Sequence, residues 1–379
     1  MNTEEQRIHT ILSNSFLGPY LDVESITDIK FNGTRLRIKD NERAPYYPKI
    51  QPTEDDVKKL IKLIADVMGQ TFTYEQLRLN TEIGILRISA SHKRISPEGT
   101  VLSVRISRPR LAIRSVESLV GANYEVVEQL FRVLMLAELS IVLSGRTNAG
   151  KTEFQKLLVG YMHDDASIFL IEDTRDSHIK ALYPERDIIS LKTIKDVYEM
   201  SEAVKDGLRN DPDYLMPAEV RGGETADALD AVKTDHAVII TIHAPSAMDI
   251  PLRAIPMIRQ SPSYTRASDV SIGNEIVRFF RFGAYLKGER NKEQKTIRYL
   301  KELVEFDSYT EKGAEGRYVY RVIKELDPMT GLYVQKQHFG KLSDRTLEEL
   351  EDKELVHLVP PIFLSDDYIR KLSKAGVLK

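Results

Sequence analysis

Eight consecutive residues have the pattern of a loop that binds nucleotide phosphates. Residues 145–152 read Gly-Arg-Thr-Asn-Ala-Gly-Lys-Thr, which fits the pattern G-x-x-x-x-G-K-[S/T]. In such a loop the backbone N–H groups bind phosphate oxygens, the lysine (Lys151) holds the β- and γ-phosphates, and the hydroxyl (Thr152) coordinates Mg²⁺. An apolar run that reads as a buried strand precedes the loop, and a helical pattern follows it. The sequence therefore predicts a site for ATP and Mg²⁺.

The residue at position 148 departs from the usual composition of this loop. Asn148 stands where many such loops have glycine. Asparagine is among the non-glycine residues that most readily adopt a left-handed backbone conformation, so we expect the loop to form. The residues expected to contact the nucleotide within the loop are Gly145, Thr147, Asn148, Ala149, Gly150, Lys151, Thr152 and Glu153.

Two glutamates follow apolar runs that read as buried parallel strands. Glu172 comes directly after Ile168–Ile171, and Glu219 comes shortly after Tyr214–Met216. The carboxyl ends of parallel strands form the edge at which open α/β sheets bind ligands. ATP hydrolysis needs one carboxylate to orient the attacking water and another beside the metal. We expect Glu172 to position the water and Glu219 to bind on the Mg²⁺ side, and the sequence also allows the reverse assignment.

Other residues carry the positive charge or the hydrogen bond that a γ-phosphate requires. His243 follows the apolar run Val238–Ile242 and is expected to bond the γ-phosphate. Guanidinium groups fit the charge that builds up on the phosphoryl oxygens during transfer. The candidate arginines are Arg209 and Arg221, which flank the segment of Glu219, and Arg87 and Arg105, on two predicted strands near the N-terminus. The last two also fit the plainer interpretation of arginines on solvated strands.

The first hundred or so residues predict a small α+β domain built on a sheet. Asn32-Gly33 joins two alternating runs and favours a tight hairpin turn. A capping sequence at Thr53 begins a helix that Gly69 ends. Strands are expected over Ser25–Asn32, Thr34–Lys39, Gly84–Ala90 and Thr100–Ser107.

After Ser107–Arg110 the helical and strand patterns alternate, with one helix expected over Ile194–Leu208. Such alternation is typical of a mostly parallel sheet with helices on both faces. Pro217 lacks an N–H for a strand ladder and is expected either to end the strand before Glu219 early or to distort it. The charged run Gly288–Lys301 is expected to be a solvated surface. The predicted organisation is an N-terminal domain over 1–108, a linker over 109–117, a P-loop domain over 118–285 and a C-terminal appendage over 286–379.

Composition excludes several other classes of protein. The chain has no cysteine, which excludes disulfide scaffolds, thiolate zinc sites and thiol nucleophiles. Its 54 lysines and arginines nearly balance 57 acidic residues, so a general nucleic-acid coat is not expected. The N-terminus lacks the features of a signal peptide, and no apolar run approaches the roughly 20 residues that span a bilayer. We therefore expect a cytoplasmic protein that reaches a membrane through a partner.

Several segments resemble, in order and spacing, the motifs of the secretion ATPase superfamily, whose members drive type II and type IV secretion, conjugation and Tad-pilus machines. Ile168–Thr174 resembles the acidic box of that family, and Ala218–Glu224 resembles its Walker B segment. Thr241–Ala244 resembles its His box, while Ile26–Ile29 and Leu102–Ile106 resemble marks of its N-terminal domain. The resemblance is closest to the conjugation and Tad-pilus branches.

The resemblance implies an α/β fold in which a RecA-like P-loop domain with a mostly parallel sheet follows a smaller α+β (PAS-like) domain. It also implies an ATP-hydrolysing homohexamer that is attached from the cytoplasm to inner-membrane secretion, conjugation or pilus platform proteins. In that family Arg87 and Arg105 would reach the nucleotide phosphates, and direct binding of nucleic acid is not expected. Two alternatives fit the same P-loop: a motor that translocates DNA or RNA, and a nucleotide-binding scaffold that does not hydrolyse ATP.

Overall fold

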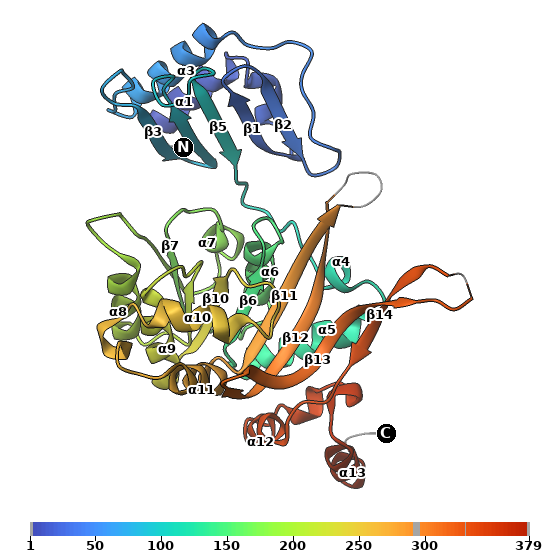
Figure 1. Cartoon of the computed structure of the whole chain (residues 1–379). Helices are drawn as coiled ribbons and strands as arrows, with labels where there is room; N and C mark the ends of the chain where they lie inside the picture. Colours follow the sequence, from blue (N-terminus) through green and yellow to red (C-terminus); the bar gives the residue numbers. More distant parts are fainter. Residues whose placement is uncertain (1–2, 291–295, 330, 377–379) are drawn as a thin grey trace. The chain divides into compact units, whose positions relative to one another are not determined.

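The chain folds into two compact units. The computed structural model describes residues 3–290, 296–329 and 331–376. Unit 1 comprises Met1–Pro109 with Arg290–Ile297, and unit 2 comprises Arg110–Glu289 with Arg298–Lys379 (Figure 1). The first boundary falls directly after Pro109.

Unit 1 is a five-stranded antiparallel sheet with helices on one face. Its elements are α1 (Thr3–Ser13), α2 (Gly18–Leu21), β1 (Ile26–Asn32), β2 (Leu36–Asp40), α3 (Glu54–Val67), β3 (Arg78–Ile83), β4 (Leu86–Ser91) and β5 (Val101–Ile106). The strands lie in the order β2-β1-β5-β4-β3. The predicted hairpin is present: Gly33 has a φ of +99°, and the Asn32 side chain accepts a hydrogen bond from the N–H of Thr34. α3 begins with a capping box at Thr53, as the sequence predicted.

Unit 2 is built on a nine-stranded sheet. Its strands are β6 (Ile141–Gly145), β7 (Ile168–Glu172), β8 (Ile188–Lys192), β9 (Tyr214–Pro217), β10 (Ala237–Ile242), β11 (Phe282–Arg290), β12 (Thr296–Thr310), β13 (Gly313–Leu326) and β14 (Tyr333–Phe339). They lie in the order β14-β13-β12-β11-β6-β10-β9-β7-β8, and neighbours from β11 to β8 are parallel. The predicted α/β fold class, with a mostly parallel sheet in the P-loop domain, is confirmed.

Helices cover both faces of this sheet, and each face has its own hydrophobic core (Figure 1). On β6, Ile141 and Leu143 join the core that contains α5 and α6, whereas Val142 joins the core under α8 to α11. Burying one such side chain stabilises the fold by about 1.5–3 kcal/mol, so the two cores hold the strands in one register. The helices are α4 (Glu117–Val120), α5 (Tyr124–Leu136), α6 (Lys151–Val159), α7 (Ile179–Leu182), α8 (Met200–Arg209), α9 (Glu224–Lys233), α10 (Ile250–Ile258), α11 (Asp269–Phe279), α12 (Asp344–Asp352) and α13 (Asp366–Lys374).

The C-terminal segment is part of unit 2, which corrects the expected appendage over 286–379. β11 runs through that boundary and pairs with β6, so that Leu286 lies opposite Gly145. β12, β13 and β14 extend the same sheet, and Leu300 and Leu303 lie in the core that contains α6. α12 and α13 contribute buried leucines to this core. Charged residues occupy buried as well as exposed positions of β12, since Glu302 and Glu305 are buried, so the charge pattern of the sequence did not reveal the buried face.

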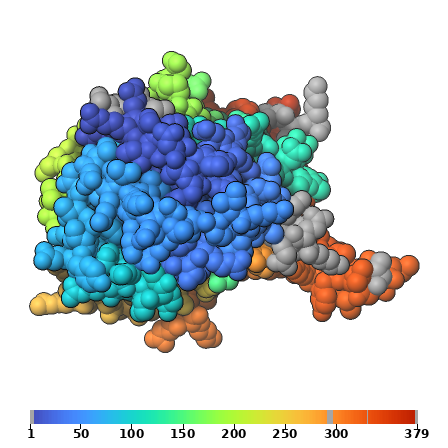
Figure 2. Space-filling view, turned by 90° about the horizontal axis from the view of Figure 1, so that it is seen from above, coloured from blue at the N-terminus to red at the C-terminus, as the bar shows by residue number. Residues whose placement is uncertain are grey.

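Apolar side chains are exposed at the tip of the β13–β14 hairpin. No helix within the described ranges is long and apolar enough to cross a membrane. The hairpin stands out from unit 2 and is visible in orange at the lower right of Figure 2. Around its tip it exposes Leu326, Met329, Leu332 and Tyr333.

Candidate active site

The predicted P-loop connects β6 to α6. β6 ends at Gly145 and α6 begins at Lys151. Gly145 has a φ of +150°, and a Cβ atom there would lie 2.4 Å from the carbonyl oxygen of Leu286 on β11. Gly150 has a φ of +101°, and Asn148 has a φ of +65°. Asparagine tolerates this left-handed conformation, so the departure at position 148 leaves the loop intact.

Lys151 is buried at the base of the loop. Its ammonium donates hydrogen bonds to the carbonyl oxygens of Gly145, at 2.9 Å, and Arg146, at 3.4 Å. Burial disfavours the charged form and lowers the pKa of Lys151 to about 8; the charge of Glu219 opposes this shift, and that of Arg221 adds to it. A bound phosphate would bring negative charge to the ammonium, so nucleotide binding and protonation of Lys151 favour each other.

His243 links the P-loop to Glu219. It follows β10 directly, and its Nδ1 atom lies 3.0 Å from the carbonyl oxygen of Gly145 and 3.4 Å from Nζ of Lys151. Its Nε2 atom lies 2.8 Å from Oε1 of Glu219. The imidazole is therefore within reach of both the phosphate loop and the carboxylate, as a residue that senses the γ-phosphate would be.

Arg221 extends this chain of contacts to a third strand. Its Nη2 atom donates to Oε2 of Glu219 at 2.6 Å, and its Nη1 atom donates to Asp173, directly after β7, at 3.1 Å. Burial alone would raise the pKa of Glu219, but the hydrogen bond and charge of Arg221, with the other nearby cations, outweigh burial and lower it. Glu219 is therefore ionised at neutral pH. β9, which precedes Glu219, ends at Pro217, as the sequence predicted.

Glu172 has a different environment from Glu219. It is the last residue of β7 and is only 3% exposed. Its Oε1 atom accepts a hydrogen bond from the N–H of Ser177 at 2.9 Å. Burial raises the pKa of Glu172, and the hydrogen bonds from Ser177 offset part of this shift. A carboxylate with a raised pKa accepts a proton more readily, which suits the predicted water-positioning role.

Two other predicted site residues are engaged away from this chain of contacts. Oε2 of Glu153 accepts the N–H of Ala112 at 2.9 Å, and Oε1 pairs with Lys156 at 2.7 Å. Arg209, the last residue of α8, pairs with Asp206 at 2.9 Å. Because α8 leads into the amino end of β9, Arg209 lies at the edge of the sheet opposite the P-loop. Contact of either residue with the nucleotide stays a prediction.

Arg87 and Arg105 lie opposite each other on β4 and β5, on the face of the unit 1 sheet that is left exposed. On the neighbouring strands, Glu82 of β3 lies opposite Arg87, and Asp28 of β1 lies opposite Arg105. Burial would raise the pKa of Asp28, but the neighbouring charges of Lys39 and Arg105 contribute to lowering it. Each arginine therefore has an acidic residue on its other side in the sheet. Contact of these arginines with the nucleotide stays a prediction.

Arg298 on β12 is a contact to the P-loop that the sequence analysis missed. Its Nε atom donates to the carbonyl oxygen of Asn148 at 2.9 Å, across 150 residues of sequence. Its Cδ atom is the nearest neighbour of a Cβ atom built on Gly150, at 3.3 Å. Burial lowers the pKa of Arg298, and the charge of Glu153 opposes that shift. Arg298 thus holds the loop at its left-handed residue.

Replacing Arg298 with methionine is expected to weaken ADP binding about tenfold or more, because a hydrogen bond from a charged donor contributes roughly 1.5–3 kcal/mol. Methionine keeps an apolar stem against Gly150 and removes the donor. Calorimetric titration measures the affinity, and the melting temperature reports whether the variant folds. Arg298→Lys keeps a charged donor and is expected to recover most of the loss. Unchanged ADP affinity in the methionine variant would show that the loop holds its conformation without Arg298.

The site offers oxygen ligands that fit Mg²⁺. Within the described residues, no group of three or more His, Cys, Asp or Glu side chains could hold a metal ion alone. Mg²⁺ prefers oxygen and is commonly bound by one or two protein groups together with substrate phosphates and waters. The Thr152 hydroxyl, in the first turn of α6, and the ionised Glu219 suit such a site.

A P-loop with a buried lysine, followed by carboxylates at the carboxyl edge of a parallel sheet, is the arrangement typical of P-loop nucleotide-binding proteins. The family model "Type II/IV secretion system protein" matches residues 75–352, and this chain belongs to that family.

Two relatives align with large parts of this chain. An uncharacterized protein of Bacillus anthracis is 31% identical over 300 residues, which cover 75% of this chain and 66% of that protein. The conjugal transfer protein TrbB of Rhizobium radiobacter is 28% identical over 188 residues, 46% of this chain and 55% of that protein. The chain therefore spans just under two thirds of the first relative and about half of the second.

Two solved structures share the fold. The ATPase DotB of Legionella pneumophila has a TM-score of 0.55 at 16% identity, with 74% of this chain and 77% of that chain covered. The pilus retraction motor PilT with bound ADP has a TM-score of 0.53 at 16% identity, with 98% and 94% covered. At this level of identity the likeness extends to the fold alone.

Proposed function

We propose that this protein is an ATP-hydrolysing motor that works as a homohexameric ring and powers a type IV secretion, conjugation or pilus machine at the cytoplasmic membrane. The observation that carries the proposal is the chain of contacts from Lys151 through His243 to Glu219. It brings a phosphate cation, a hydrogen-bonding imidazole and an ionised carboxylate to one edge of the sheet. Relatives named for conjugal transfer and type IV secretion support the kind of machine.

The residues at this edge of the sheet have distinct parts in the proposed hydrolysis. Lys151 and the N–H groups of the loop hold the phosphates, while Thr152 and Glu219 would hold Mg²⁺, which neutralises phosphate charge when it is bound with ATP. Arg221 fixes the orientation of the Glu219 carboxylate. His243 connects the loop to Glu219, so loss of the γ-phosphate would change the contacts of both. Glu172 is the candidate that orients water and accepts its proton.

Two alternatives predict different behaviour. A motor that translocates DNA or RNA would need a basic channel with salt-sensitive binding, which the near balance of 54 basic and 57 acidic residues does not favour. A scaffold that only binds nucleotide would release no phosphate. In the proposed machine, the ring would reach the membrane through inner-membrane platform proteins.

Glu219→Gln and Glu172→Gln are each expected to keep ATP binding and to lose turnover by more than about a hundredfold, because an amide keeps the shape of a carboxylate but not its charge or basicity. Steady-state phosphate release measures turnover, and titration with a fluorescent ATP analogue measures binding. Glu185→Gln, at an exposed glutamate, serves as the matched control and should behave as the wild type.

The outcomes separate the roles. A Gln variant that hydrolyses ATP within a few-fold of the wild type would remove that glutamate from the mechanism. The slower of the two variants identifies the better candidate for positioning water. If the wild type binds ATP and releases no phosphate, the scaffold alternative replaces the motor.

A further inference from the structure

A hollow lies in unit 2 where β12 and β13 separate. The ladder between these strands ends at the pair Glu302–Arg321, and β13 continues from there paired with β14. Figure 1 shows the two strands running in different directions beyond this point. The hollow has a volume of about 400 Å³ and is lined by residues of β11, β12, β13 and β14.

The lining of the hollow has an excess of positive charge. Its cations are Lys287, Lys301, Arg321 and Lys324. One carboxylate, Glu302, also lines it, and Glu289 pairs with Lys287 at 3.0 Å and with Lys324 at 3.5 Å. Even with both acids counted, two positive charges are left over. The excess favours an anionic ligand.

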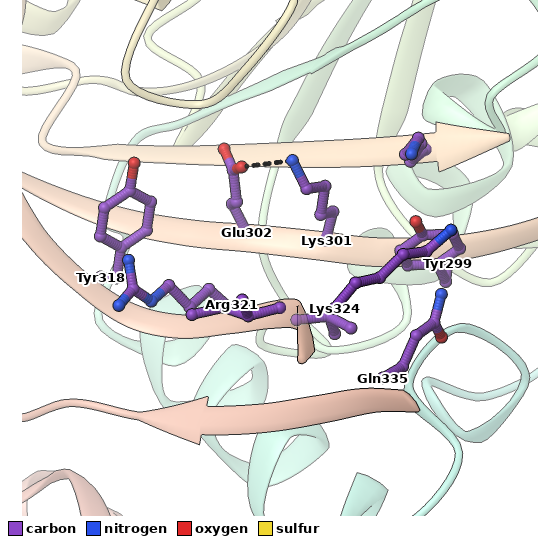
Figure 3. A pocket seen from close by; sticks show the side chains of 10 residues that line it. Tyr299, Lys301, Glu302, Tyr318, Arg321, Lys324 and Gln335 are labelled. Carbon is purple, nitrogen blue, oxygen red and sulfur yellow. Dashed lines mark ion pairs between the residues drawn. The ribbon is translucent and has the colours of Figure 1, made fainter. Parts of the chain in front are cut away.

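Two cations are held in place for such a ligand (Figure 3). The Arg321 guanidinium lies over the Tyr318 ring, 4.9 Å from its centroid, and has no ion-pair partner among the described residues. Nζ of Lys301 lies 3.1 Å from Oε1 of Glu302, whose other oxygen accepts the N–H of Ala247 at 2.9 Å. An arginine stacked on an aromatic ring presents a planar fork of donors that fits phosphate in a bidentate manner.

We propose that this hollow binds a compact small molecule that carries two or more phosphate groups. Its volume of about 400 Å³ lies within the range of small-molecule sites. The hollow begins at Glu302–Arg321, the last pair of the β12–β13 ladder. A compact ligand fits its volume better than an extended acidic peptide, which would lie along a strand edge. The run Gly288–Lys301, which was expected to be a solvated surface, is not solvated throughout, since Leu300 is buried and Tyr299 and Lys301 line the hollow. Residues 291–295 of this run lie outside the described residues. The proposed site uses no residue of the P-loop and does not depend on ATP hydrolysis.

Calorimetric titration of the full chain with inorganic tripolyphosphate tests the proposal. The wild type is expected to show two binding events, one at the P-loop and one at the hollow. Lys151→Ala should lose the first event and keep the second. Arg321→Gln should weaken the second by about tenfold or more and keep the first, because one bidentate charged contact is lost. Arg317→Gln, at an exposed arginine of the same strand that pairs with Asp307, is the matched control and should change neither.

Several outcomes would overturn the proposal. If Arg321→Gln binds tripolyphosphate as the wild type does, or if Lys151→Ala loses all binding, the hollow does not bind this ligand. If Arg317→Gln weakens the second binding event as much as Arg321→Gln does, the effect comes from general surface charge and not from the hollow. Citrate or a hexaglutamate peptide that binds as tightly as tripolyphosphate would rule out a phosphate ligand. If Arg321→Gln fails to fold, Lys301→Gln, which leaves the stack of Arg321 on Tyr318 in place, provides the same test.

Discussion

Lys151→Ala is expected to reduce ATP turnover by at least about a hundredfold, because the loop loses the cation that stabilises charge on the β- and γ-phosphates. The fold should persist, since the Lys151 ammonium contacts loop carbonyls and His243 rather than a hydrophobic core. Steady-state phosphate release measures turnover, and circular dichroism checks the fold. Lys205→Ala, at an exposed lysine of α8, is the matched control. Turnover near the wild-type rate in folded Lys151→Ala would contradict the ATPase assignment.

The same variant has a second readout in the dependence of stability on pH. The pKa of Lys151 is lowered from 10.5 to about 8 in the folded protein. Between pH 8 and 10.5 the unfolded chain therefore holds a proton that the folded chain has released, so the contribution of this group to stability increases with pH. Relative to Lys151→Ala, the nucleotide-free wild type should gain up to about 3 kcal/mol in the free energy of unfolding across this window. Urea unfolding at several pH values measures the difference, and a constant difference would contradict the buried charge.

Local signals account for the parts of the fold that the sequence predicted well. The turn at Asn32-Gly33 and the cap at Thr53 depend only on residues next to them in the chain. The helix expected over Ile194–Leu208 was wrong in its first part, because a tight turn closed by a bridge between Ile194 and Tyr198 lies there and α8 begins only at Met200. The sequence also did not predict β8, which precedes this turn. β8 is an edge strand that pairs only with β7 in the sheet, and its mixed burial gave no clear pattern.

The candidate site also has a part that the sequence could predict and a part that depends on the tertiary structure. The P-loop is one contiguous motif, so its position could be predicted. Glu172 and Asp173 are consecutive, yet the first is buried against Ser177 while the second pairs with Arg221. Which of them faces Glu219 depends on the strand order β10-β9-β7, which the sequence does not specify. Arg298 could not be found for the same reason, because its contact requires β12 to pass beside the P-loop.

Arg105→Ala is expected to reduce ATP turnover by about a thousandfold or more, as the loss of an arginine that acts on the transferred phosphoryl group does. Arg105 belongs to unit 1, whereas Lys151 and Glu219 belong to unit 2. In the proposed ring, each Arg105 would therefore act either on the nucleotide of its own chain or on that of the next subunit. Its cross-strand position beside Arg87 places two guanidinium groups where one phosphate could bind both. We expect Arg105 to act on the neighbouring subunit.

Mixing two inactive proteins, Lys151→Ala and Arg105→Ala, distinguishes the two arrangements. If Arg105 acts across the interface, about one quarter of the junctions in an equal mixture pair an intact P-loop with an intact arginine, and phosphate release returns. If it acts within its own chain, every site still lacks one group, and the mixture stays inactive. Energy transfer between labelled subunits has to show that exchange occurred, and Arg37→Ala, at an exposed arginine of the same sheet, should be active without mixing. Inactivity despite exchange would refute the shared site and would leave Arg105 with a role inside its own chain.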